Sequence, residues 1–104
     1  MVLSPNITYG DKVVAVTGAS ALTLLAAVAS TKHRIFLLSI TADTAGLITI
    51  ADMTTPKCYL PANGSYVFDF GALGLKQGTA NTAITLTNSG GGNLSAYAIY
   101  SEET

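Results

Sequence analysis

The sequence offers few side chains from which an acid–base or nucleophilic active site could be built. His33 is the only histidine, so a general base that titrates near neutral pH would depend on it. No nucleophile or carboxylate lies at a spacing that ties it to this residue. Because His33 stands between Lys32 and Arg34 at the start of a strand pattern, we expect it at a solvent-exposed strand end.

The acidic residues and the cysteine give no stronger indication of chemistry. Asp43, Asp52 and Asp69 would form a glycosidase pair only at a controlled separation, which their positions in the sequence do not establish. Cys58 has no second cysteine with which to form an intrachain disulfide or a metal cluster. No D-x-D-x-D-G calcium loop occurs. The sequence therefore predicts no enzyme, no metal site and no cofactor.

Charge and hydropathy also argue against nucleic acid and membrane partners. The formal net charge is −1, and the five basic residues are dispersed except at 32–34. The three glycines at 90–92 lack the lysine of a phosphate-binding loop, so we expect a hairpin tip there. The apolar run 21–29 is half as long as the roughly 20 residues of a membrane helix. The N-terminus lacks signal-peptide features, so we expect the three N-x-S/T triplets to stay unmodified.

The elements that must position any site read as short β-strands. Stretches rich in Ile, Val, Leu, Thr and aromatic residues are bounded by Gly, Asn, Asp or Pro. The run 21–29 is compatible with a buried helical turn, but its length and its neighbours favour a strand. The expected strands are 13–17, 21–29, 33–43, 47–53, 57–60, 65–70, 82–88 and 94–100. About eight short antiparallel strands predict a single all-β domain, an antiparallel β-sandwich of jelly-roll type or a small barrel.

Two local pairings are expected within this domain. The tight connection 43–46 predicts that 47–53 returns as the antiparallel partner of 33–43. The segment 89–92 predicts a second hairpin between 82–88 and 94–100. The strand 33–43 is apolar on both faces for half its length, which predicts a central position. Leu73 and Leu75, in a glycine-rich loop, are expected to close one end of the core.

Composition points to the surface as the functional part. Charged residues are 11% of the chain, against about 25% in an average domain, whereas hydrophobic residues are 49%. So little charge predicts that part of the surface is covered by other protein, and we expect an oligomer. The aromatic residues gather in the C-terminal half, where a core or subunit interface is favoured over a carbohydrate-binding face; they are Tyr59, Tyr66, Phe68, Phe70, Tyr97 and Tyr100.

The order of the segments resembles a known protein family. The run LLAAVASTKHRI is followed by IFLLSITAD, by GLITIA and by LPANGSYVFDFGALG, then by a Thr-alternating strand and a last strand ending in Tyr. This order resembles the small jelly-roll capsid decoration (cement) proteins of tailed bacteriophages and related trimeric virion modules. The resemblance covers residues 13–100. It departs where Leu75 and Lys76 replace the aromatic residue that commonly follows the A-L-G element.

The resemblance implies a mechanical role without catalysis. A homotrimer would sit on the capsid exterior and bridge major capsid proteins, after synthesis in the cytoplasm of the host bacterium. We expect an N-terminal arm at 1–12, a jelly-roll domain at 13–101 and a charged tail at 102–104. The expected partner-binding residues are Leu3, Pro5, Ile7 and Tyr9 of the arm, with Tyr59, Tyr66, Tyr97 and Tyr100. The alternative is a tail or fibre module that recognises host glycans through these four later tyrosines.

Overall fold

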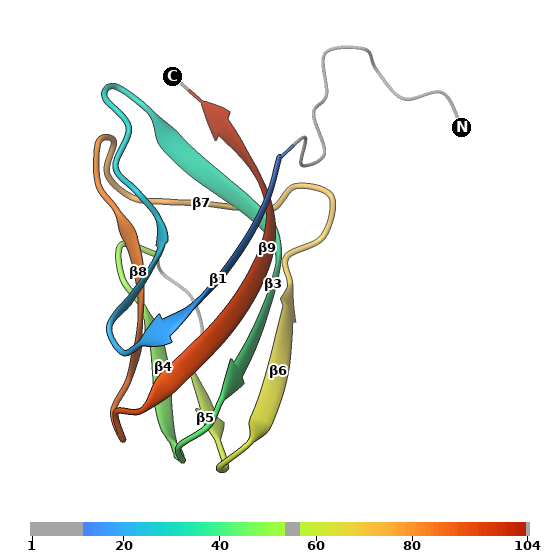
Figure 1. The fold of residues 1–104 in the computed structure, drawn as a ribbon. Helices are drawn as coiled ribbons and strands as arrows, with labels where there is room; N and C mark the ends of the chain where they lie inside the picture. Colours follow the sequence, from blue (N-terminus) through green and yellow to red (C-terminus); the bar gives the residue numbers. More distant parts are fainter. Residues whose placement is uncertain (1–11, 54–56, 104) are drawn as a thin grey trace.

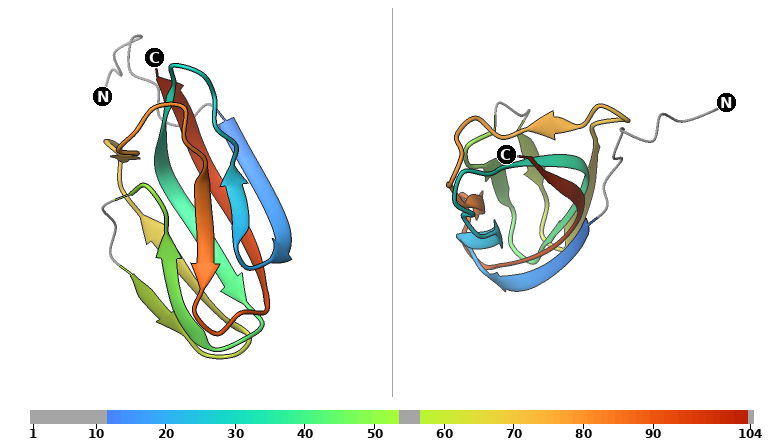
Figure 2. Two further views of the ribbon diagram at one scale, coloured as in Figure 1. Left: turned by 90° about the vertical axis from the view of Figure 1, so that its left-hand side faces the viewer. Right: turned by 90° about the horizontal axis from the view of Figure 1, so that it is seen from above.

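The structure, a computed structural model, describes residues 12–53 and 57–103, and this part of the chain contains strands and no helix (Figure 1). The strands are β1 (Lys12–Ala19), β2 (Leu22–Leu25), β3 (Lys32–Ala42), β4 (Gly46–Ile50), β5 (Cys58–Leu60), β6 (Gly64–Asp69), β7 (Leu75–Lys76), β8 (Ile84–Asn88) and β9 (Asn93–Glu103). They form two antiparallel sheets that enclose one core, as the view from above shows (Figure 2). The predicted all-β sandwich is confirmed.

The sheets combine strands that are distant in the sequence. The larger sheet has the order β1-β9-β3-β6, and the short β7 pairs with the start of β3. The smaller sheet has the order β2-β8-β4-β5. The two predicted hairpins are therefore wrong, because β3 and β4 lie in different sheets, as do β8 and β9. The turns at 43–45 and 89–92 are corners at which the chain passes from one sheet to the other (Figure 1).

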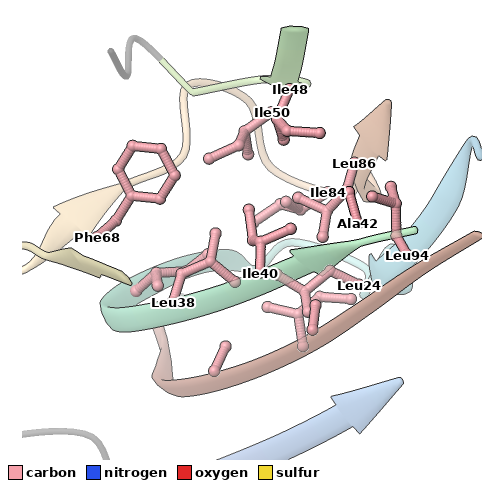
Figure 3. Packing of buried hydrophobic residues seen from close by; sticks show 14 of the residues in the cluster. Leu24, Leu38, Ile40, Ala42, Ile48, Ile50, Phe68, Ile84, Leu86 and Leu94 are labelled. Atoms are coloured by element: carbon pink, nitrogen blue, oxygen red, sulfur yellow. The ribbon is translucent and has the colours of Figure 1, made fainter. Parts of the chain in front are cut away.

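The reason for this error lies in how the core is filled. Leu38 and Ile40 of β3 point across the sandwich toward Ile48 and Ile50 of β4 (Figure 3). Alternating hydrophobicity shows which side chains of a strand point inward. The same alternating pattern arises whether two strands pair side by side in one sheet or pack face to face in different sheets. The pattern of 33–53 therefore does not show which of these arrangements is formed.

The two corners are tied to each other by hydrogen bonds. The side chain of Asp43 accepts a hydrogen bond from the Asn93 amide at 2.8 Å. Asn88, which is buried, donates from Nδ2 to the carbonyl of Thr44 at 2.7 Å and accepts from the Gly90 amide at 2.9 Å. These bonds satisfy backbone groups that the sheets leave unpaired where the chain turns.

The structure confirms two predictions, that the ambiguous run 21–29 contains a buried strand and that the strand 33–43 is central. In the run 21–29, Leu22–Leu25 form the strand β2, in which Leu24 and Leu25 are buried. The strand β3 is central, with β9 on one side and β6 on the other, and Ile35 and Phe36 are both buried at its β-bulge. Fully burying one such aliphatic or aromatic side chain stabilises the fold by about 1.5–3 kcal/mol.

One end of the sandwich differs from expectation. Leu73 does not close the core, because its side chain is 83% exposed. The strand β9 continues through Glu102 and Glu103, which pair with His33 and Lys32 of β3, so these residues belong to the sheet rather than to a tail. Three ion pairs of lysine or arginine with these glutamates lie at this end: Lys12–Glu102 at 3.6 Å, Arg34–Glu103 at 2.9 Å and Lys76–Glu103 at 3.9 Å.

Candidate interaction surface

The structure separates the four tyrosines that the sequence grouped. Tyr97 lies on the outer face of the larger sheet, and Tyr59, the most exposed of them, lies on the outer face of the smaller one. Tyr66 lies at the edge strand β6, with its ring 4.8 Å from that of Phe68. Tyr100 packs against the core. The four tyrosines therefore do not lie together on one face of the molecule. Leu3, Pro5, Ile7 and Tyr9 fall outside the described residues.

A continuous surface does form where the strands β1, β9, β3 and β6 lie side by side. The register aligns their outward side chains in three rows of four, hereafter the outer face. The rows are Val13, Ile99, Leu37 and Asp69; Ala15, Tyr97, Ser39 and Val67; and Thr17, Ser95, Thr41 and Ser65. The one charged residue among the twelve is Asp69, at a corner. Val13, Val67 and Tyr97 are 59%, 52% and 41% exposed.

A shallow hollow of about 220 Å³ lies in the outer face beside Tyr97. Its lining includes Ala15 and Ser39, the cross-strand neighbours of Tyr97, and three residues of the third row, Thr17, Ser95 and Thr41. Because small side chains flank a large ring, the ring forms one wall of the hollow. The outer face therefore carries a projecting aromatic group and an adjacent depression, without charge in either.

Of the twelve residues of the outer face, the sequence indicates only Tyr97 as a candidate for binding. The signal of the outer face was present as uncharged residues at every second position of 13–17, 37–41 and 95–99. Only the register of four strands from different parts of the chain shows that these positions form one surface.

His33 is buried, and the prediction that it is exposed to solvent is wrong. Its side chain is only 3% accessible, and Oε1 of Gln77 lies 2.7 Å from the His33 amide nitrogen and 2.8 Å from Nδ1. Nε2 of Gln77 donates to Asp52 Oδ2 and to the Thr82 carbonyl, each at 2.9 Å. Since the amide nitrogen of Gln77 is the donor to both, Oε1 is the acceptor and Nδ1 of His33 carries its proton.

The network around Gln77 is structural. On the other side of the ring, Nε2 of His33 lies 3.4 Å from Glu102 Oε2. The network thus joins β3, β9 and the segment after β4. A histidine enclosed in this way has no open position for a substrate, so its geometry supports packing and not general-base catalysis.

Two other titratable groups have shifted pKa values. Burial raises the pKa of the Cys58 thiol, which disfavours the reactive thiolate. Burial also acts to raise the pKa of Asp52, but hydrogen bonds from Gln77 and Thr79 and the charge of Lys32 outweigh it, and the pKa is lowered. Within 12–53 and 57–103 no three His, Cys, Asp or Glu side chains gather as metal ligands. No helix in these ranges is long and apolar enough to cross a membrane.

The lowered pKa of Asp52 predicts a pH-dependent stability. A carboxyl whose pKa is lower in the folded state stabilises the fold above its unfolded value, and this stabilisation is lost as the pH falls below about 4. We expect Asp52→Asn to be less stable than the wild type at pH 6 by less than about 1 kcal/mol, because the carboxylate is solvent-screened. The difference should shrink toward pH 2.5 in urea titrations. A difference that is constant across this range would contradict the assignment.

Comparison with known proteins adds no relative from which a role could be transferred. No protein-family model matches the chain, and no curated protein and no solved structure matches it.

Proposed function

We propose that this chain is a non-enzymatic structural protein of a virion, a capsid decoration protein that trimerises and bridges major capsid proteins on the outside of the head. The observation that carries the proposal is the outer face of the larger sheet, on which Asp69 is the one charged residue among twelve. An exposed sheet face with Val13, Val67 and Tyr97 on it suits contact with protein better than contact with water alone. The resemblance in segment order supplies the virion as the setting.

The pairing of the strands supports this proposal, because we infer from it a jelly-roll topology. The first strand pairs with the last (β1 with β9), and β2 pairs with β8, β3 with β6 and β4 with β5. Nested pairing of this kind describes one long hairpin wrapped into two four-stranded sheets. The short β7 adds only a two-residue bridge to β3. Jelly rolls likewise place eight antiparallel strands in two sheets, so the nested pairing favours this topology among β-sandwiches.

Capsid binding tests the proposed function. Purified heads assembled from the major capsid protein of the source virus should acquire regular extra density after incubation with this protein, as seen by electron microscopy. By resemblance, deletion of the expected arm 1–12, shortened to residues 1–11 because Lys12 begins β1, should abolish capsid binding and leave the oligomer intact. Wild-type protein that leaves the heads bare would refute the proposal, and full occupancy by the truncated protein would refute the role of the arm.

Glycan recognition is the second candidate, and one observation favours it. The lining of the hollow beside Tyr97 includes Thr17, Ser39 and Ser95, and residues that carry hydroxyl groups are suited to bind sugars. Of the four tyrosines expected for this alternative, Tyr97 is the one that lines the hollow. A glycan-array signal that is lost in Tyr97→Ala and kept in Tyr59→Ala would support it.

A further inference from the structure

We infer that the outer face is the surface through which copies of this chain contact each other, with Tyr97 as the central contact. Because a face that meets an identical face makes a two-fold contact between two copies, this inference goes beyond the trimer of the proposed function and names a second contact. Three properties of the described residues lead to it: the distribution of charge, the contrast with the opposite face, and the shape around Tyr97.

The charge distribution suits contact between identical surfaces. When the same patch of two subunits meets, a charge near its centre faces a like charge, which costs several kcal/mol. The rows of the outer face that contain Tyr97 and Ser95 have no charged residue at all. Asp69, the single charged residue of the outer face, lies at the end of the edge strand β6 and accepts a hydrogen bond from the Gly71 amide at 2.9 Å. An uncharged centre can therefore meet a copy of itself without repulsion.

The opposite side of the sandwich is different in chemistry. The outer face of the smaller sheet carries mainly threonine, at positions 23, 49, 85 and 87, with Leu47 and Tyr59 at one corner. Threonine hydroxyls on this face hydrogen-bond to water, so its burial against another protein gains little free energy. The outer face of the larger sheet presents Val13, Ile99, Leu37 and Val67 instead. Apolar area, which gains free energy when it leaves water, is thus concentrated on one side.

The size of the outer face is sufficient for a specific contact. Four strands about 4.8 Å apart and three rows about 6.8 Å apart span roughly 400 Å² in projection. With the relief of the side chains, two such faces bury on the order of 1,000 Å², the lower limit for a specific interface. An interface of this size depends on its centre, so one charge placed there should have a large effect.

The centre of the outer face carries Tyr97, whose ring can pack into the same hollow on a second copy. Tyr97 lies in the middle row between Ala15 and Ser39, and the 220 Å³ hollow lies beside its ring. A tyrosine from a second copy can enter the hollow and pack against the first ring, since the two surfaces are the same. Tyrosine is enriched among the residues that dominate interface energy, because its ring buries area and its hydroxyl keeps a polar partner.

The test compares two tyrosines on opposite faces. We expect Tyr97→Lys to weaken self-association at least about tenfold, measured by sedimentation velocity with multi-angle light scattering across a range of concentrations. Tyr59→Lys, a more exposed tyrosine on the other sheet, should associate like the wild type, and so should Tyr97→Phe. The circular dichroism spectrum of Tyr97→Lys shows whether the variant is folded, and so distinguishes a loss of contact between copies from a folding defect.

Several outcomes would overturn the inference. Unchanged association of Tyr97→Lys, dissociation by Tyr59→Lys, or a wild type that stays monomeric at every concentration would each do so. A monomeric wild type whose glycan-array signal depends on Tyr97 would assign the same surface to a sugar. The capsid assay separates the two proposals: capsid binding with unchanged association of Tyr97→Lys refutes this inference alone. Bare capsids with a dissociated Tyr97→Lys refute the capsid role alone.

Discussion

Replacing Gln77 with leucine is expected to lower the free energy of unfolding by about 3 kcal/mol. The leucine side chain cannot accept from the buried His33 amide or from Nδ1, and it cannot donate to Asp52. Each buried polar group left without a partner costs about 1–3 kcal/mol. In a domain of this size, each kcal/mol corresponds to roughly 4–8 °C in Tm. Urea denaturation and thermal scans measure both quantities.

The neighbouring residue provides the control for this experiment. Lys76, the last residue of β7, directly precedes Gln77, but its side chain is 42% exposed and contacts Glu103 at 3.9 Å. Exposed ion pairs contribute about 0–1 kcal/mol, so Lys76→Leu should remain within about 1 kcal/mol of the wild type. Equal stability of the two variants would show that the Gln77 network is not what holds this end of the sandwich.

The second large effect is expected at Gly46, where β4 begins. A Cβ atom at this position would overlap Oδ1 of Asn88 and lie 2.6 Å from the amide nitrogen of Gly90. Asn88 cannot move away without losing its bonds to Thr44 and Gly90. We therefore expect Gly46→Ala to destabilise the fold by about 3 kcal/mol, as overpacking against buried groups does.

Gly78 is the matched control for Gly46. The nearest atom to a Cβ at Gly78 is Oδ1 of Asp52 at 3.4 Å, which is an ordinary contact distance. Gly78→Ala should therefore change the urea midpoint little. If both alanine variants unfolded at the same midpoint as the wild type, the close packing of the two corners would be disproved.

These two sites belong to opposite ends of one scaffold. The network around Gln77 holds the end at which β3 begins and β9 ends, and Asn88 with Gly46 holds the end with the two corners (Figure 2). Between them the outer face is left free of these structural contacts, so its residues can be changed with less risk to the fold. That separation makes Tyr97→Lys an interpretable variant.

The sequence by itself determined eight of the nine described strands and the scarcity of side chains suited to catalysis, whereas β7 falls in a segment that it predicts as a loop. Alternating residues and turn residues placed the strands within a few positions, as in 65–70 against Gly64–Asp69, because both signals act over a few neighbouring residues. A low charge content likewise follows from counting, and it pointed to the surface as the functional part.

The tertiary structure alone decided the pairing of the strands, the burial of His33 and the existence of the outer face. The sequence does not determine the pairing, because an alternating pattern is the same for strands that pair within one sheet and for strands that face each other across the core. His33 is buried because Gln77, 44 residues further along the chain, supplies the acceptor for its amide and its ring. The outer face exists because β1, β9, β3 and β6 align in one register. Each of these depends on contacts between distant segments, which no local pattern encodes.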